Sequence, residues 1–343
     1  MQRKKTSKYP PSLFAHNMMQ RAARNLDCQN GAAKGILGRM ISALTSQVEP
    51  FVSQLVSLNS KSKMTEGGPS SPIIVSGSSG IPRMAQYKSI RGMPSMAAGI
   101  KNLTDTVSSS IFADTYKRST ADTVASTESL GEKLSQTPAN CAKTSPSNCF
   151  GNAAARSQSR LQLQFEKVAR MIKMRNGSAS PSERATFYTS QGGGYDTHAN
   201  LGDTLDAYLT ELDNAVGDFA REMKSQGLWD NVVMVTTSDF ARTLTSNGLG
   251  TDHGWGGNNF VMGGKIKGGQ ILGDFPTTLA QAAPLSISHQ VGRGRLVPTT
   301  PWESIWHAIS QWMDVDATKM KELLPNMQNF PADKAWKKEA MFE

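Results

Sequence analysis

The sequence predicts an α/β protein with a mostly parallel sheet and helices on both faces. The prediction rests on two strand-and-helix passages in the second half of the chain, each with a short apolar run and a long amphipathic segment. A strand that is apolar along its whole length is typical of a parallel sheet, because such a sheet is covered on both faces. Amphipathic helices are the elements that cover it.

The elements of this half alternate along the chain. Helices are predicted where apolar residues recur at spacings of three and four, and Gly227 marks the end of the longest one. Strands are predicted where short apolar or β-branched runs meet glycine or polar loops. The predicted elements are a helix over 161–176, a strand over 185–189, a helix over 201–225, a strand over 232–236 and a helix over 302–313.

The first 160 residues give weaker patterns. Apolar spacings over 34–58 predict two helical stretches around Pro50, whereas 59–80 is rich in Ser, Gly and Pro and 104–150 is rich in Ser, Thr and Ala. The latter segments indicate a cap or excursion beside the core. We therefore divide the chain into a basic tail or replaced N-terminal segment (1–33), a helical and Ser/Thr/Gly-rich cap-like region (34–160), an α/β core (161–331) and a C-terminal tail (332–343).

Composition and charge exclude several classes of protein. The chain has 343 residues, 38% apolar and 19% charged, and its apolar runs are short, which excludes a disordered polyelectrolyte and a membrane-spanning protein. The formal charge of +9 lies in residues 1–150, with 18 basic and 8 acidic side chains against 19 and 20 in the remainder. These basic residues are scattered and lack interleaved aromatics, so a nucleic-acid partner is not expected.

The cysteines and the first residues say little about the compartment. Cys28, Cys141 and Cys149 are too few for a disulfide framework and lack metal-ligand spacing. Cys141 and Cys149 close a short loop, which is compatible with a disulfide and with two free thiols. Pro10 and Pro11 stand where a signal peptide needs its apolar core. No compartment and no oligomeric state follow from the sequence.

Polar clusters follow the predicted strands. In an open α/β sheet, ligands bind beyond the carboxyl ends of the strands, where loops of different origin converge. We therefore expect the clusters to meet at one site. They are Gly194-Tyr195-Asp196-Thr197-His198 after the first strand, Thr237-Ser238-Asp239-Phe240-Ala241-Arg242 after the second, and Thr251-Asp252-His253-Gly254-Trp255 in a Gly-rich loop.

The carboxylates and imidazoles of these clusters predict a divalent-cation site. Asp196 precedes His198 by two residues, Asp252 directly precedes His253, and Asp239 lies at a strand end. Such a set is typical of zinc, with manganese, magnesium or calcium as alternatives. The structural alternative is that Asp196 caps the next helix and that Asp252 and His253 shape a turn.

The motifs of this region also carry a family resemblance. YDTHAN, VVMVTTSDFAR, GTDHGWGGNNFVMGG and GDFP lie within residues 192–276, and together they resemble the domain-of-unknown-function 1501 family. That family resembles the alkaline phosphatase and sulfatase superfamily of metal-dependent hydrolases. The resemblance is strong from Leu161 to Phe330 and weak before Leu161. It implies an alkaline-phosphatase-like core.

Transferred residue by residue, the resemblance implies roles for the clustered side chains. Asp196, His198 and His253 are expected to bind one metal ion, and Asp239 is expected to contribute to a second. Superfamily members carry a histidine directly after this second aspartate, whereas this chain has Phe240. The usual ligand set of the second ion is therefore incomplete.

Two further side chains complete the expected site. Asp252 is the substitute ligand that the sequence offers for the second ion. Arg242 is placed to offer a forked cation to an oxyanion, or to form an ion pair at a helix start. His16 and His289, by contrast, are interpreted as solvent-exposed loop or tail residues.

The resemblance leaves the nucleophile unidentified. Family members usually open with a strand, a Gly-rich Asp loop and a Ser-His segment, and residues 1–33 contain no such pattern. Two functions are therefore compatible with the sequence. The first is a metal-dependent hydrolase of small anionic phosphate or sulfate esters. The second is a catalytically silent truncated or binding protein that retains the fold. If the N-terminus is truncated, the resemblance implies export.

Overall fold

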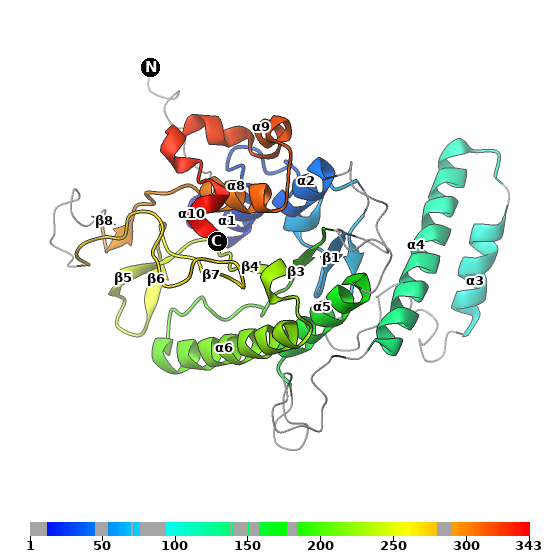
Figure 1. Ribbon diagram of the computed structural model, residues 1–343, viewed down its shortest axis with the longest axis horizontal. Helices are drawn as coiled ribbons and strands as arrows, with labels where there is room; N and C mark the ends of the chain where they lie inside the picture. Colours follow the sequence, from blue (N-terminus) through cyan, green and yellow to red (C-terminus); the bar gives the residue numbers. More distant parts are fainter. Residues whose placement is uncertain are drawn as a thin grey trace.

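The computed structural model describes most of the chain as a mixed α/β protein (Figure 1). Helices account for more residues than strands do. Pro50, Cys141, Cys149 and His289 lie outside the described residues, so the expected loop pairing of the two cysteines is not described. The described residues are 12–44, 54–69, 71–75, 94–106, 108–137, 139, 150, 158–176, 184–279 and 290–343.

A small parallel sheet lies at the centre of the fold. Its strands are ordered β2-β1-β3, and both pairings are parallel. Val56 at its centre lies opposite Ile73 on one side and Phe187 on the other. The strands are β1 (Leu55–Ser57), β2 (Ile73–Ile74) and β3 (Thr186–Tyr188).

Successive residues of this sheet contribute to two different cores. Leu55 and Tyr188 face the cluster formed with α2 (Ile36–Ala43) and α8 (Trp302–Trp312). Val56 and Phe187 face the cluster formed with α5 (Arg160–Asn176) and α6 (Leu201–Ser225). Helices therefore cover both faces, as expected. The expectation of a helix at 55–58 was wrong, because a short run buried on both faces has no alternation that separates it from a helix.

The other strands form antiparallel pairs, so the expected large parallel sheet is absent from the described residues. The 25 residues between β4 and β7 hold the β5–β6 hairpin in place of a crossover helix. A connection of this length could hold a parallel crossover, but here it folds into a hairpin, and β7 runs antiparallel to β4. The pairs are β4 (Val233–Val235) with β7 (Val261–Gly263), β5 (Arg242–Ser246) with β6 (Thr251–His253), and β8 (Gln290–Val291) with β9 (Arg295–Leu296).

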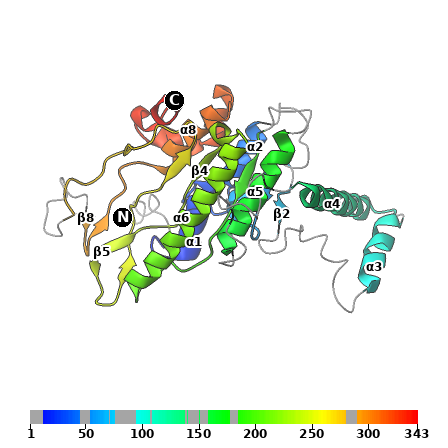
Figure 2. The same ribbon diagram turned by 60° about the horizontal axis from the view of Figure 1, so that its bottom comes forward.

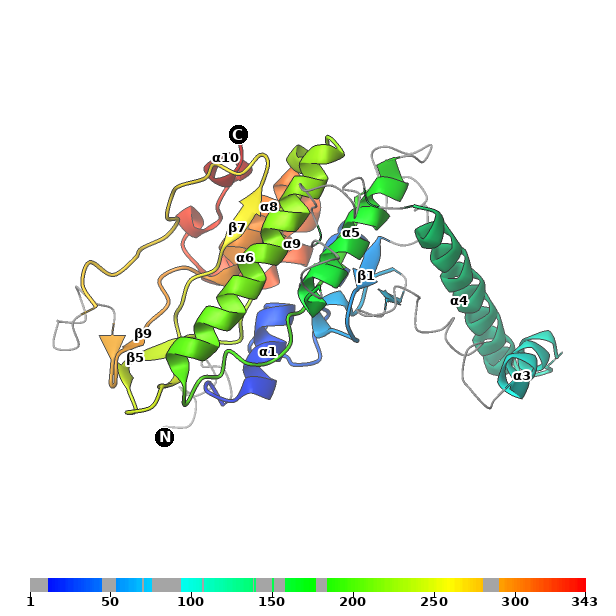
Figure 3. The ribbon, with the colours of Figure 1, turned by 90° about the horizontal axis from the view of Figure 1, so that it is seen from below.

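Two long helices cover one face of the sheet. α5 (Arg160–Asn176) and α6 (Leu201–Ser225) run side by side and match the predicted helices within one residue at each end (Figure 3). Their apolar faces meet at Phe165 and Phe219, whose ring centroids are 5.2 Å apart. This cluster includes Met171 and Met223, which are fully buried.

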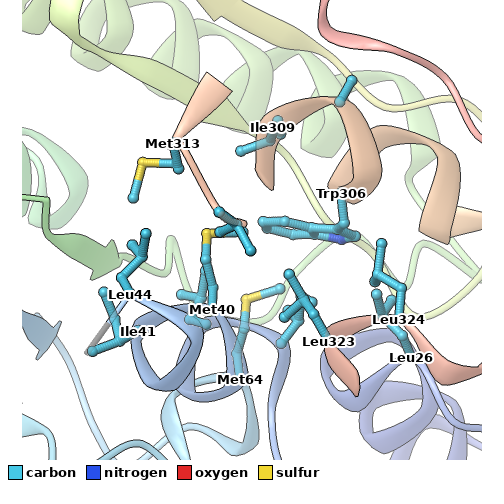
Figure 4. Close-up of a cluster of buried hydrophobic side chains, with 14 of the residues drawn as sticks. Leu26, Met40, Ile41, Leu44, Met64, Trp306, Ile309, Met313, Leu323 and Leu324 are labelled. Carbon is cyan, nitrogen blue, oxygen red and sulfur yellow. The ribbon is translucent and has the colours of Figure 1, made fainter. Parts of the chain in front are cut away.

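A second core lies on the opposite face, between helices from both ends of the sequence. Met40 and Ile41 belong to the same buried cluster as Trp306 and Ile309 (Figure 4). The last residues join this core too, since Phe342 is buried and stacks on a tryptophan of α8. The helices of this side are α1 (His16–Asn25), α2 (Ile36–Ala43), α8 (Trp302–Trp312), α9 (Met320–Leu323) and α10 (Lys338–Met341).

A helical pair stands apart from the rest of the molecule in all ribbon views (Figures 1, 2 and 3). α4 (Ile111–Gln136) contacts α5 through its last turns, and α3 (Pro94–Asp105) packs on α4. This pair forms part of the region expected to be cap-like. The short 3₁₀ helices are η2 (Lys63–Thr65), η4 (Trp229–Asn231), η5 (Ala317–Lys319), η6 (Pro325–Asn329) and η7 (Ala332–Lys334).

The described helices were compared with the length and apolar composition of a membrane-spanning helix. Among the residues that the structure describes, no helix combines the length and the apolar composition needed to cross a bilayer.

Candidate metal centre

The loop between β3 and α6 brings two of the predicted ligands to the site. Asp196 and His198 lie in this loop, and the backbone N–H of Thr251 donates to the carbonyl of Thr197, which ties the loop to β6. A Cβ atom on Gly250 would lie 2.4 Å from that carbonyl oxygen. Glycine is therefore required where the hairpin meets the loop.

The β5–β6 hairpin presents the second set of side chains. His253 lies opposite Arg242 in the antiparallel register. Asp252 precedes it in β6, and Asp239 lies in the loop between β4 and β5. The three predicted segments thus lie together, but Asp252 and His253, expected in a Gly-rich loop, belong to strand β6.

Three predicted ligands meet at one point. Asp196 Oδ1 lies 3.0 Å from the Nε2 atoms of both His198 and His253. These two Nε2 atoms are 3.1 Å apart. Two imidazole lone pairs and a carboxylate oxygen at such separations repel one another unless a proton or a cation lies between them.

A fourth group, His16, was missed by the sequence analysis. His16 is the first residue of α1, and its Nε2 lies 3.1 Å from Asp196 Oδ2. Its ring packs 4.7 Å from the ring of Phe240 and 4.6 Å from that of His253. The interpretation as a solvent-exposed residue was therefore wrong, since this side chain is 39% exposed and lies in the cluster. No local sequence signal marks it, because its partners Asp196, Asp239 and His253 are 180 or more residues away.

The three imidazoles share one arrangement of close contacts. Each ring directs Nε2 toward the Asp196 carboxylate and Nδ1 toward another oxygen. Carboxylate and carbonyl oxygens only accept hydrogen bonds, so in the absence of a cation either nitrogen of a ring can donate. A cation among the Nε2 atoms would place the proton of each neutral ring on Nδ1. The Nδ1 contacts are His16 to Asp239 Oδ2 at 2.5 Å, His198 to Asp252 Oδ1 at 3.2 Å, and His253 to the Phe14 carbonyl at 2.7 Å.

The surrounding charges keep Asp196 ionised. Burial on its own raises the pKa of Asp196, but hydrogen bonds from Arg242, His253 and His16 and the charge of His198 outweigh burial and lower the pKa to about 2. The side chain is still 40% exposed. The carboxylate is therefore charged at neutral pH and open to solvent on one side.

The two predicted carboxylates behind the histidines are held by other groups. The pKa of Asp252 is lowered chiefly by the Asn247 side-chain hydrogen bond, against a raising effect of burial, and further by His198 and Arg293. Asp239 Oδ1 accepts the backbone N–H of Phe240 at 3.2 Å.

Arg242 is engaged within the protein. Its guanidinium donates through Nε to Thr251 Oγ1 at 3.1 Å, through Nη2 to the Thr251 carbonyl and through Nη1 to Asp196 Oδ1. The side chain is 20% exposed. The guanidinium group of Arg242 therefore holds the Asp196 carboxylate next to β6.

The donor set fits a divalent cation of the zinc type. In a tetrahedral site with bonds of about 2.0 to 2.1 Å, the ligand atoms lie about 3.3 Å apart. The contacts of 3.0 to 3.1 Å around Asp196 are close to this spacing. One ligand atom each from His16, Asp196 and His253 lie within 4.8 Å of one another. The Nδ1 contacts supply the orienting oxygens that metal-binding histidines have.

Comparison with known proteins identifies the family. None of the curated proteins and none of the solved structures gives a significant match. A family model described as a protein of unknown function (DUF1501) matches residues 95–289, which is more than half of the 343 residues. The match includes Asp196, His198 and His253 but not His16. The chain therefore belongs to the DUF1501 family of proteins of unknown function.

Proposed function

We propose that the protein binds a divalent cation through His16, Asp196, His198 and His253. The observation that carries this proposal is the shared orientation of the three imidazoles, each with Nε2 toward one carboxylate and Nδ1 on an oxygen. A tail or turn histidine needs no such arrangement. Metal-binding histidines use it to fix the tautomer and the ring orientation.

Zinc is the cation that this donor set favours. Imidazole nitrogens suit zinc, whereas magnesium and calcium prefer sites made of oxygens. Asp239 and Asp252, predicted as ligands, are proposed instead to orient His16 and His198 from behind. This division of roles gives one cation a complete set of protein ligands.

We propose hydrolysis of phosphate or sulfate esters as the activity of this centre. A bound divalent cation supplies Lewis acidity, which stabilises the negative charge that develops on an ester oxygen. Asp196, the one carboxylate among the proposed ligands, is 40% exposed, so the centre is open to a substrate from the solvent side. Arg242 holds Asp196 in place and, in this proposal, acts by positioning that ligand. The superfamily likeness to alkaline phosphatases and sulfatases supports the choice of ester.

The runner-up function is a silent cation-binding protein, and one observation favours it. All three Nδ1 atoms are occupied by orienting oxygens, and the Nε2 atoms face Asp196. No imidazole of the centre thus contacts a serine or threonine hydroxyl among the described residues. A side-chain nucleophile activated by histidine is therefore not part of the proposal.

Metal content of the purified protein tests the cation site. We expect about one equivalent of zinc in the wild type and close to none in the His198→Ala/His253→Ala double variant, since two ligands are lost. His307→Ala is the matched control, because His307 Nδ1 donates to the Trp336 carbonyl away from the cluster. An unchanged zinc content in the double variant would remove the site.

An assay of ester turnover then distinguishes the proposed hydrolase from the catalytically silent alternative. The wild type, reconstituted with zinc or manganese, is assayed on generic phosphate and sulfate esters. Turnover that requires the cation and is lost in Asp196→Ala supports the hydrolase. A fully loaded protein without turnover supports the silent alternative.

A further inference from the structure

Four large apolar side chains are exposed around the turn that joins α3 to α4. Ile111 and Phe112 in the first turn of α4 are 82% and 89% exposed, and Tyr116 in the next turn is 69% exposed. Leu103, near the end of α3, is 54% exposed. We call these four residues the tip patch. Single exposed apolar residues need no explanation, but several of them on one projecting helical pair indicate a contact surface.

The first half of α4 lacks the packing that stabilises most helices. The buried residues of α4 among those described are Leu130 and Leu134, which lie near its end and belong to the cluster with α5 and α6. Residues 111–122 span about 18 Å, and each of their side chains is exposed or half-buried. Helical segments of this length are marginal in water and depend on an apolar face packed against a neighbour. The short helix α3 packs beside α4 (Figure 1), but it leaves the tip patch uncovered.

The charges around the tip patch are balanced. Residues 94–122, which comprise α3 and the first half of α4, hold three basic and three acidic side chains. In α3, Lys101 Nζ lies 2.5 Å from Asp105 Oδ2. In α4, Arg118 Nη2 lies 2.9 Å from Asp114 Oδ2. A surface with equal numbers of both charges does not repel a copy of itself, and it lacks the excess of cations that draws a protein to an anionic membrane.

The area of the tip patch fits association with a second copy of the chain. A large aromatic side chain buries about 150–250 Å², so the four residues together offer roughly 500–600 Å² on one copy. Two facing patches would bury about 1,000–1,200 Å², which reaches the lower limit of specific protein interfaces. The charged side chains around the patch add to this area. In a two-fold arrangement, the basic groups of one copy also approach the acidic groups of the other.

We propose that two copies of the chain associate through their tip patches as a two-fold dimer. Phe112 and Tyr116 are four residues apart in α4, so they lie side by side on one face of the helix and form the centre of the contact. The two helical pairs then cover each other as a cluster of four helices, which gives the first half of α4 an apolar neighbour. The dimer does not depend on the cation centre, to which the pair contributes no residue.

Sedimentation equilibrium of the full chain over roughly 1 to 300 µM protein tests the proposal. We expect the mass of the wild type to rise from that of one chain to that of two across this range. In the Phe112→Ser/Tyr116→Ser double variant, we expect the dissociation constant to rise about 100-fold or more, because the aromatic centre of the contact is lost. Both side chains are exposed in the single chain, so the circular dichroism of the dilute variant should match that of the wild type.

Two further variants locate the contact. Leu249→Ser/Ile271→Ser is the matched control, because these side chains are 75% and 74% exposed and lie outside the helical pair. It should associate as the wild type does. Phe112→Asp places an extra negative charge in both facing patches, so we expect this variant to sediment as a single chain at every concentration.

Three outcomes would overturn the proposal. The first is a wild type that sediments as a single chain over the whole range. The second is association that persists in both tip variants or is weakened equally in the matched control, since the copies then meet through another surface. The third is a wild type that stays a single chain but sediments with vesicles of phosphatidylcholine and phosphatidylserine, and does so less in Phe112→Ser/Tyr116→Ser. That result would assign the tip patch to a lipid surface.

Discussion

His16 faces opposite demands in the absence and in the presence of a cation. Burial on its own lowers the pKa of His16, but hydrogen bonds and charges from Asp239 and Asp196 outweigh burial and raise it above 6.5. Without a cation, the protonated ring pairs favourably with both carboxylates. With a cation, the ring must be neutral to offer Nε2.

The cation-free protein and the zinc-loaded protein should therefore respond to pH in opposite directions. A raised pKa means that the stability from His16 is present below pH 6.5 and is lost as the pH rises through the folded-state pKa. We expect the melting temperature of the cation-free wild type, relative to His16→Ala, to fall by about 1–3 °C between pH 6 and pH 8. The stabilisation by zinc should grow over the same range. Differential scanning fluorimetry checks both trends, and parallel trends would contradict the assigned role.

At the scale of single residues, the sequence predicted the site residues that follow strands but not the site groups near the N-terminus. Asp196 and His253 were predicted because each lies at a strand end or in a Gly-rich loop beside another candidate ligand. His16 has no such neighbour, and Phe14 takes part only through its backbone carbonyl. A carbonyl carries no residue signature, so no sequence pattern could have indicated it.

Helix α2 is an element whose packing depends on the lack of a side chain. A Cβ atom on Gly38 would lie 2.2 Å from the carbonyl oxygen of Glu66 and 2.9 Å from the backbone N of Gly68. Both atoms belong to backbone that cannot turn aside. The helix therefore lies directly on the segment that follows η2.

We expect Gly38→Ala to destabilise the protein by about 1–3 kcal/mol, because the added methyl group forces these backbones apart. In a free helix the same substitution stabilises by about 0.5–1 kcal/mol. Gly217→Ala in α6 is the matched control, since its Cβ atom would meet only the end of the Arg221 side chain at 3.5 Å. Urea denaturation measures both changes. A stabilised Gly38→Ala variant would show that α2 is not packed this way.

At the scale of elements, long periodic segments were predictable and short buried ones were not. α5 and α6 each repeat their apolar spacing over many turns, which fixed their type and nearly their ends. β1 has three residues, all buried, so no alternation distinguishes it from a helix. The antiparallel pairing of β4 with β7 depends on a strand that is separated from β4 by 25 residues. The local pattern around β4 contains no information about that strand.

At the scale of the whole molecule, the proposed centre joins three distant parts of the fold. Its groups come from α1, from the loop before α6 and from β6. The projecting α3–α4 pair takes no part in it (Figure 2). Cation binding should therefore stabilise these three parts together and leave the projecting pair unchanged.

Hydrogen exchange measures this coupling directly. With free zinc at 100 times its dissociation constant, we expect amide exchange through openings that break the site to slow by about 100-fold in α1, residues 194–200 and β5–β6. Peptides from residues 111–130 of α4 should exchange at unchanged rates. The His198→Ala/His253→Ala double variant serves as control and should lose the effect. Equal slowing in α4 would contradict a local centre.

The distance in sequence between His16 and His253 also orders the events of biosynthesis. Residue 16 leaves the ribosome long before residue 253 is translated, and Arg295 Nε, which donates to the carbonyl of His253 at 3.1 Å, follows later still. Until His253 emerges, a nascent chain displays His16, Asp196 and His198 without the fourth ligand of the proposed centre. Under the proposed function, loading with zinc is a late step of maturation, and the cell must deliver the ion to a chain whose synthesis is nearly or fully complete.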